Sequence, residues 1–133
     1  MSGNTNLEQL LSGMQPMLHE EDYVFCTVPS WDVVDLQKIT GFFKEAEGFT
    51  IIVEKKWADS LQLSYTYIAA WISLTVHSSL DAVGLTAAFS SALASEGISC
   101  NVVAAFYHDH IFVNRNDANR AMNTLLGLAA KYR

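Results

Sequence analysis

"WISLTVHSSLDAVGLTAAFSSALASEGISCNVVAAFYHDHIFVNRNDANRAMNTLLGLA" is the sequence of residues 71–129, and the order of elements that it predicts decides the fold. The spacing of its apolar residues, with those just before it, predicts in order a strand at 67–76, a helix at 84–95, strands at 98–107 and 110–115, and a helix at 117–131. A strand, a crossover helix, a hairpin and a second helix form a split βαβ arrangement. In this arrangement both helices cover one face of an antiparallel sheet.

The first half of the chain predicts further strands that complete or extend this sheet. Its pattern predicts in order a short amphipathic helix at 5–14, two strands within 16–28 joined by an acidic turn at Glu20–Asp22, a hairpin at 39–53 with its turn at 45–48, and a short helical segment at 55–63. The split βαβ unit of the second half lacks its final strand. We therefore expect an α+β fold whose halves do not fold independently, with the best seam near Ser64.

The composition is that of an ordinary globular chain. The 133 residues are 50% hydrophobic and carry a formal net charge of −6. Nucleic-acid binding requires clustered lysine and arginine, which this acidic sequence does not show. No signal-peptide pattern and no apolar run of membrane-spanning length is present, so we expect a cytoplasmic protein without a membrane partner. Cys26 and Cys100 are far apart in sequence and are expected to be free thiols.

The segment "FYHDHIFV" (residues 106–113) places two histidines on either side of an aspartate. In one interpretation His108 and Asp109 are the two loop residues of a tight hairpin, and one polar side chain there is functional. In a second, the segment is an ordinary solvated turn. In a third it is a metal site, which needs at least three ligands. His108 and His110 supply two of them, and His77 is the only candidate for the third.

The loop "HSSLDAVG" (residues 77–84) differs from a generic connection because polar groups precede a helix. The first turn of that helix presents free backbone N–H groups and a partial positive charge to a carboxylate. Gly84 would let a ligand approach the backbone closely, and Asp81 would hold an ammonium group. Carboxylate and ammonium together suggest an amino acid. The alternative is that Ser79 or Asp81 only caps the helix.

No sequence motif of an enzyme is present. Ser78 and Ser79 follow His77 directly, but neighbours on a loop do not make a nucleophile–base pair. The sequence contains no G-x-S-x-G, no phosphate-binding glycine loop and no paired cysteine and histidine signature. We therefore expect a non-catalytic protein.

Residues 71–129 resemble an ACT domain, whose pattern is a strand, a loop with an aspartate and then a glycine, a helix ending in a Gly-Ile turn, a hairpin and a second helix. The residues that match this pattern are Asp81, Gly84, Leu85, Leu93, Gly97 and Ile98. The whole chain is similar to small bacterial ACT-like proteins that pair hairpins of the "FKEAEGFTIIVEKKWADSLQL" type (residues 43–63) with a C-terminal ACT unit. The resemblance implies a ferredoxin-like fold with two ACT-like halves, residues 1–65 and 66–133.

ACT domains are non-catalytic regulatory modules that bind amino acids or similar small molecules, usually between two ACT units. The resemblance implies a ligand-facing loop from His77 to Leu85, with Asn101 on the adjacent strand and Asp109 at an acidic position of related tandem ACT-like sensors. Val83 departs from the family pattern, since many ACT loops have proline before the glycine. The implied ligand-binding residues are His77, Ser79, Asp81, Val83, Gly84, Leu85, Asn101 and Asp109.

These observations predict a cytoplasmic, homodimeric ACT-like protein that binds a small amino-acid-like ligand and uses no cofactor or metal. As a free-standing module it would act through a protein partner or bind its ligand for another purpose. Two alternatives remain at this point. One is a structural or protein-interaction module without a ligand. The other is a small metal-dependent enzyme that uses His77, His108 and His110.

Overall fold

The computed structural model describes residues 6–76 and 82–133 of the chain. The chain forms two compact units. Unit 1 comprises Met1–His19 and Trp71–Arg133, and unit 2 comprises Glu20–Ala70. Among the described residues, no helix has both the length and the apolar character needed to cross a membrane.

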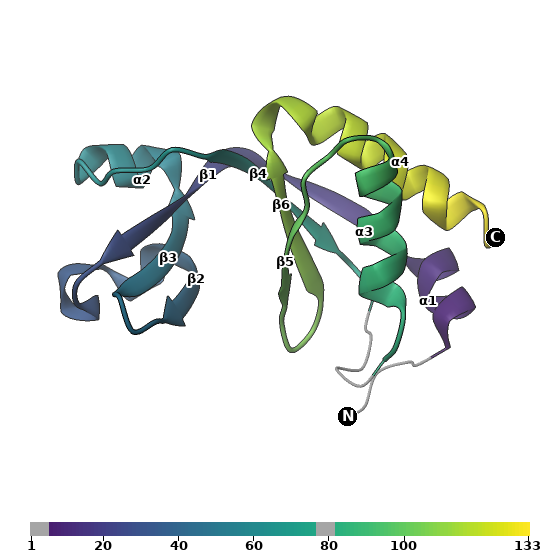
Figure 1. Ribbon diagram of the computed structural model, residues 1–133, viewed down its shortest axis with the longest axis horizontal. Helices are drawn as coiled ribbons and strands as arrows, with labels where there is room; N and C mark the ends of the chain where they lie inside the picture. The colour runs from purple at the N-terminus through teal and green to yellow at the C-terminus, as the bar shows by residue number, and fades with distance from the viewer. Residues whose placement is uncertain (1–5, 77–81) are drawn as a thin grey trace. The chain divides into compact units, whose positions relative to one another are not determined.

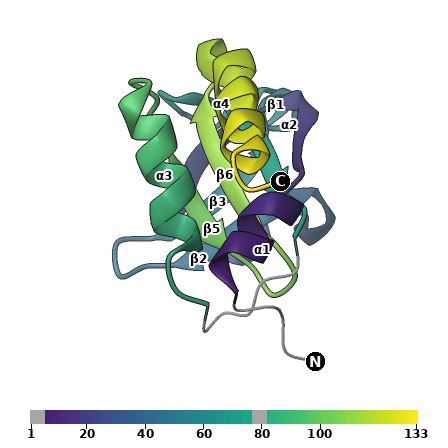
Figure 2. The same ribbon diagram turned by 90° about the vertical axis from the view of Figure 1, so that its right-hand side faces the viewer.

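Unit 1 is a sheet with three helices on one of its faces (Figures 1 and 2). Its strands lie in the order β1, β4, β6, β5. The strands of this unit are the first residues of β1 (Pro16–Val28), most of β4 (Ile68–Leu74), β5 (Asn101–Ala104) and β6 (Asp109–Asn114). The helices are α1 (Leu7–Gly13), α3 (Leu85–Ser95) and α4 (Ala118–Ala130), and each contacts the other two. The predicted strand–helix–hairpin–helix order of the second half is confirmed.

Alternation along the strands directs apolar side chains into the core between this sheet and its helices. Ile72 and Leu74 of β4, and Ile111 and Val113 of β6, are fully buried. The helices contribute buried side chains at helical spacing, namely Leu10, Leu11, Phe89, Leu93, Ala121, Leu125 and Ala129. The opposite face of the same strands therefore carries the residues between them, among them Trp71, Ser73 and His110.

Unit 2 is a three-stranded antiparallel sheet with the order β2, β3, β1. It consists of the second part of β1, β2 (Ile39–Lys44), β3 (Phe49–Glu54), the helix α2 (Lys55–Ser60), and the short helical turns η1 (Trp31–Val33) and η2 (Leu36–Lys38). Its core cluster comprises Val24, Cys26, Val28, Ile51, Val53 and Ala58. The predicted hairpin and helical segment are thus confirmed, and Cys26 and Cys100 are free thiols.

The predicted acidic turn at Glu20–Asp22 is wrong, because β1 continues as one strand from Pro16 to Val28. The two ends of this strand belong to different units. Its first residues belong to unit 1, whereas the residues from Tyr23 to Val28 pair with β3 in unit 2. Extended backbone is required on both sides of the acidic residues, so no chain reversal occurs there.

The β5–β6 connection is longer than the predicted two-residue turn at His108 and Asp109. Ala104 pairs with Asp109, so Asp109 is the first residue of β6, and the loop is Ala105–His108. The backbone N–H of Ala105 donates to the carbonyl of His108 (3.1 Å) and closes this loop. Register explains the difference. Because a one-residue slip would turn every side chain of β6 to the other face, the buried positions of β6 fix its pairing with β5.

The helix ends also differ in detail from the sequence prediction. The sequence predicts a helix from residue 117, but Arg115–Asp117 form the helical turn η3, which Asn114 caps by accepting from the Asn116 N–H (2.9 Å). The α4 helix then begins at Ala118. The extra turn moves the cap two residues toward the N-terminus, because the chain turns directly as β6 ends.

Candidate ligand-binding site

One end of unit 1 brings together two of the sequence-predicted ligand-binding segments. The start of α3 and the β5–β6 loop lie at the same end of the unit (Figures 1 and 2). A weak contact joins this loop to the segment after β4, since His108 Nδ1 lies 3.5 Å from the Val76 carbonyl oxygen. Three predicted ligand-binding residues, His77, Ser79 and Asp81, lie outside the described residues. The described part of the site is therefore formed by Gly84, Leu85 and Asp109.

Gly84 occupies the N-cap position of α3 with the left-handed backbone conformation (φ 99°). No described side chain caps this helix. The first helical hydrogen bond runs from the Ala88 N–H to the Gly84 carbonyl (2.9 Å), so the N–H groups of the first turn have no helical partner. Leu85 is buried, and the neighbouring Val83 is exposed. This helix start therefore offers backbone donors that no described side chain caps, beside a buried apolar anchor.

Two glycine-to-alanine substitutions should change stability in opposite directions. An alanine at position 84 would have to adopt the positive φ of this glycine, and its Cβ would lie 3.1 Å from Leu7 Cδ2. Gly84→Ala should therefore destabilise the protein by about 1–2 kcal/mol. Gly127 lies inside α4, and a Cβ there would meet nothing within 4 Å. Gly127→Ala should stabilise by about 0.5–1 kcal/mol because it removes backbone freedom from the unfolded chain. Urea unfolding of both variants tests this pair, and a change of the same sign in both would contradict it.

Asp109 supplies a carboxyl group at the same end of the unit. It is only 8% exposed, although it is the first residue of β6. By strand alternation it lies on the face of Ile111 and Val113, which is the face that the helices cover. Burial raises the pKa of its carboxyl, whereas the neighbouring His110 and His108 act to lower it. A buried carboxylate is costly unless a cation accompanies it, so this position suits a positively charged ligand group.

Asn101 is placed apart from Asp109. It pairs with Phe112 across the β5–β6 ladder, and its Nδ2 donates to the Phe112 carbonyl (3.2 Å). Residues directly opposite in an antiparallel pair point to the same face, so Asn101 lies on the face away from the helices. The structure therefore places Asn101 on the opposite face of the sheet from Asp109.

The sequence analysis missed a polar cluster on the face of the unit 1 sheet away from the helices. His19 of β1, Ser73 of β4 and His110 of β6 are connected by hydrogen-bond distances of 2.8 Å (His19 Nε2 to Ser73 Oγ) and 2.9 Å (Ser73 Oγ to His110 Nδ1). The Trp71 indole N–H also donates to His110 Nδ1 (3.0 Å). The only sequence signal was the alternation of Trp71 and Ser73 with buried aliphatic residues in β4.

The metal interpretation lacks support in the described part of the chain. There, no group of three or more histidine, cysteine, aspartate or glutamate side chains is placed to hold a metal ion. The His108 and His110 rings are 6.5 Å apart between centroids and nearly perpendicular. His77, the third ligand in that interpretation, lies outside the described residues.

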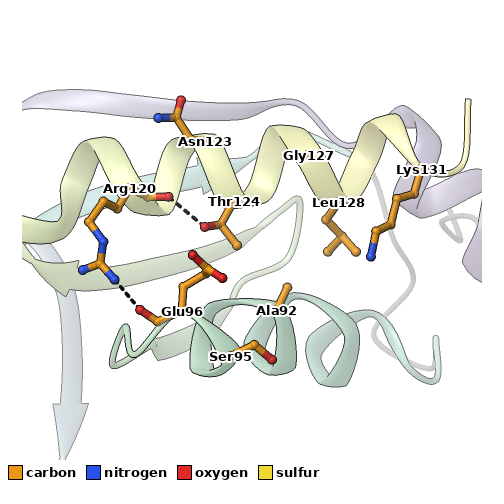
Figure 3. Close-up of a pocket in the computed structure, with 9 residues that line it drawn as sticks. All are labelled: Ala92, Ser95, Glu96, Arg120, Asn123, Thr124, Gly127, Leu128 and Lys131. Carbon is orange, nitrogen blue, oxygen red and sulfur yellow. Dashed lines mark hydrogen bonds between the residues drawn. The ribbon is translucent and has the colours of Figure 1, made fainter.

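A groove between α3 and α4 is a separate feature of unit 1 (Figure 3). It has a volume of about 600 Å³ and is lined by Ala92, Ser95, Glu96, Arg120, Asn123, Thr124, Gly127, Leu128 and Lys131. Its principal cation is already engaged, because Arg120 donates to the Glu96 carbonyl and pairs with Asp117 at 2.8 Å. The α3 residues of this groove belong to the C-terminal part of that helix, so the groove is distinct from the site at Gly84.

Comparison with known proteins identifies the family. One ACT domain family model matches residues 2–70, and a second ACT domain model matches residues 66–126. No match was found among the curated proteins. The two matched ranges overlap at residues 66–70. The chain passes from one compact unit to the other after residues 19 and 70, because β1 and β4 each contribute residues to both units. The domain boundary between residues 65 and 66 stays a prediction.

Several solved structures are similar to this chain. A Vibrio cholerae protein of unknown function, described as a possible transport protein, is 45% identical over 92% of this chain and 95% of its own, with a TM-score of 0.83. An Agobacterium tumefaciens protein is 15% identical over 87% and 89% of the two chains, with a TM-score of 0.69. The regulatory subunit of aspartate kinase from Thermus thermophilus is 10% identical over 85% and 95%, with a TM-score of 0.62. The last two likenesses show the fold alone.

The fold and both family matches agree with the expectation from the sequence. The α+β class, the antiparallel strands with helices on one face, and the presence of two ACT halves are confirmed. This chain belongs to the ACT domain family.

Proposed function

We propose that this protein is a non-catalytic regulatory ACT module of the cytoplasm that binds a small amino-acid-type ligand. One observation carries the proposal: the buried Asp109 carboxyl lies at the same end of unit 1 as the α3 start, whose backbone N–H groups no described side chain caps. The backbone N–H groups can bind a carboxylate, and the Asp109 carboxyl can bind an ammonium group. These are the two charged groups of an amino acid.

The ligand carboxylate is held by the first-turn N–H groups of α3, from Leu85 onward. Gly84 has no side chain to obstruct this approach, and the partial positive charge of the helix start favours an anion there. The ligand ammonium faces Asp109, with Asp81 as a second carboxylate from the preceding loop. His77, Ser79 and Val83 form the remainder of the ligand-facing loop in this proposal.

The fold comparisons support a regulatory role. Structural neighbours include the regulatory subunit of aspartate kinase from Thermus thermophilus, and that protein shares this fold with a TM-score of 0.62. The proposal includes a homodimer, because β5 is an outer strand of its sheet and edge strands are commonly protected by association. Regulation then acts through a protein partner that recognises the liganded form.

A thermal-shift screen against the standard amino acids tests the proposal, with the oligomeric state measured by light scattering. A ligand at about 100 times its dissociation constant should stabilise the protein by about 2.7 kcal/mol, which is several degrees for a chain of this size. The amide and the N-acetyl derivative of the amino acid that binds should both fail, because each lacks one of the two recognised charges. A flat screen would contradict ligand binding and favour a protein-interaction module.

A further inference from the structure

A continuous hydrogen-bond chain crosses three strands of unit 1 on the face of the sheet away from the helices. It runs from His19 Nε2 to Ser73 Oγ (2.8 Å) and from Ser73 Oγ to His110 Nδ1 (2.9 Å). The Trp71 indole nitrogen reaches the same His110 Nδ1 at 3.0 Å. Ser73 is only 3% exposed, so its hydroxyl exchanges little with water. The chain therefore links β1, β4 and β6 through side chains in addition to their backbones.

The chemistry of these groups determines where each proton lies. An indole nitrogen only donates, so His110 Nδ1 must be unprotonated and accept the Trp71 bond. The Ser73 hydroxyl then donates to the same nitrogen, because two lone pairs 2.9 Å apart would repel each other. The Ser73 oxygen is left to accept from His19 Nε2–H. His110 is thus neutral with its proton on Nε2, and His19 carries a proton on Nε2.

The surroundings favour this neutral state. The His19 ring stacks on Trp71, with 3.5 Å between the centroids and 9° between the planes. Burial lowers the pKa of His19, and His110 lowers it further. Burial likewise lowers the pKa of His110, His108 adds to this, and Asp109 opposes it.

No other described titratable group is identified as acting on the two histidines. Ser73 and Trp71 are the residues that β4 contributes, and neither titrates in the relevant range. Asn101 and Val103 of β5 share the face of His110 and carry no titratable group.

We propose that the hydrogen-bond chain of His19, Ser73, His110 and Trp71 is a proton-sensitive latch. It holds β1, β4 and β6 of unit 1 together while His110 is neutral, and it releases Trp71 when His110 is protonated. A proton on His110 Nδ1 would face the Trp71 N–H, so two donors would oppose each other and the bond would be lost. The Ser73 hydroxyl would also have to turn away. This inference does not depend on the proposed ligand.

The latch is asymmetric between its two histidines. Protonation of His19 adds a proton at Nδ1 and leaves the Nε2–H donor to Ser73 in place. Protonation of His110 removes the acceptor on which both Trp71 and Ser73 depend. His110 is therefore the switch, and His19 is a supporting donor.

The sign of the pH dependence follows from these pKa directions. The folded state lowers the pKa of both histidines below the ordinary histidine value of 6.5, so the unfolded state binds protons more readily. The contribution of the latch to stability is present above about pH 6.5 and is lost as the pH falls through the lowered folded values.

Nitrogen-15 NMR of the full chain tests the latch directly. Long-range correlations should show His110 with an unprotonated Nδ1 at neutral pH, titrating with a midpoint below about 6.5. The Trp71 indole N–H resonance should shift with the same midpoint. An Nδ1–H tautomer of His110 at neutral pH, or a Trp71 resonance that ignores the His110 titration, would overturn the proposal.

Two substitutions separate the switch from its support. His110→Asn places an amide oxygen near the Nδ1 position and cannot titrate, so the Trp71 resonance should keep only the shift caused by the stacked His19 ring. His19→Gln retains a donor near the Nε2 position, so the Trp71 resonance should still follow His110. A Trp71 resonance that still titrates when both histidines are replaced in this way would refute the assignment. Should His110→Asn fail to fold, the tautomer and the shared midpoint in the unmodified protein decide the question.

Discussion

Asp109→Asn should raise the thermal unfolding midpoint of the ligand-free protein at neutral pH and remove most of its response to an amino acid. Burial raises the folded-state pKa of this carboxyl above its unfolded value. The protonated form therefore favours folding at low pH, and this advantage is lost as the pH rises through the raised folded pKa. Above its raised folded pKa this carboxyl is a buried charge in the folded protein, and asparagine would remove that charge.

Ligand binding should change in the opposite direction. Removal of a carboxylate that pairs with an ammonium group in a buried site typically costs roughly 2–5 kcal/mol of binding free energy. This loss raises the dissociation constant by about 30-fold or more. Titration calorimetry of Asp109→Asn with the amino acid found in the screen measures this loss. A stabilised protein with weakened binding would show that the buried charge is retained for function rather than for folding.

Glu96→Gln is the matched control, because Glu96 is an exposed acid at the C-terminal end of α3, away from Gly84. It removes the same charge and should leave both the stability and the affinity close to those of the unmodified protein. The stability difference between Asp109→Asn and the unmodified protein should also shrink as the pH falls. Equal affinities in Asp109→Asn and Glu96→Gln would remove Asp109 from the binding site.

Phe89→Ala should lower the free energy of unfolding by about 3–5 kcal/mol, which exceeds the effect of any other substitution considered for stability. Phe89 is fully buried on α3 and is among the largest side chains of the core. Its removal loses the transfer free energy of a phenyl ring and leaves a cavity that close-packed neighbours fill only in part. Urea unfolding followed by circular dichroism measures the change.

Phe106→Ala is the corresponding control. Phe106 is 65% exposed in the β5–β6 loop, where its ring meets Tyr107 edge-on at 5.0 Å between centroids. Its truncation should change stability by no more than about 0.5 kcal/mol. If the two phenylalanine variants lost similar stability, the assignment of the unit 1 core would be incorrect.

Local periodicity was sufficient to predict most elements of the second half of the chain. The spacing of Leu85, Phe89 and Leu93 identifies one buried face of α3, and all three are buried in the structure. Gly97 ends this helix with a positive φ of 72°, as its position in the sequence suggested. These features depend on contacts between residues a few positions apart, so the sequence shows them directly.

The candidate site was only partly accessible to the same reasoning. Gly84 was predicted as a ligand-binding residue because a glycine before a helix is a local pattern, whereas Asp109 was predicted from the resemblance to tandem ACT-like sensors. The placement of Asp109 inside β6, on the buried face, depends on the pairing of Ala104 with Asp109. Sequence alone favoured a shorter turn, because it did not contain the register that the core imposes.

The sequence by itself therefore determined the family, the α+β class and the helices of unit 1. Only the tertiary structure showed that β1 is one strand shared by two units. It also brought together His19, Ser73 and His110, which are 54 and 37 positions apart along the chain. Sheet pairing is non-local, and the burial of each side chain is set by partners that no short segment contains.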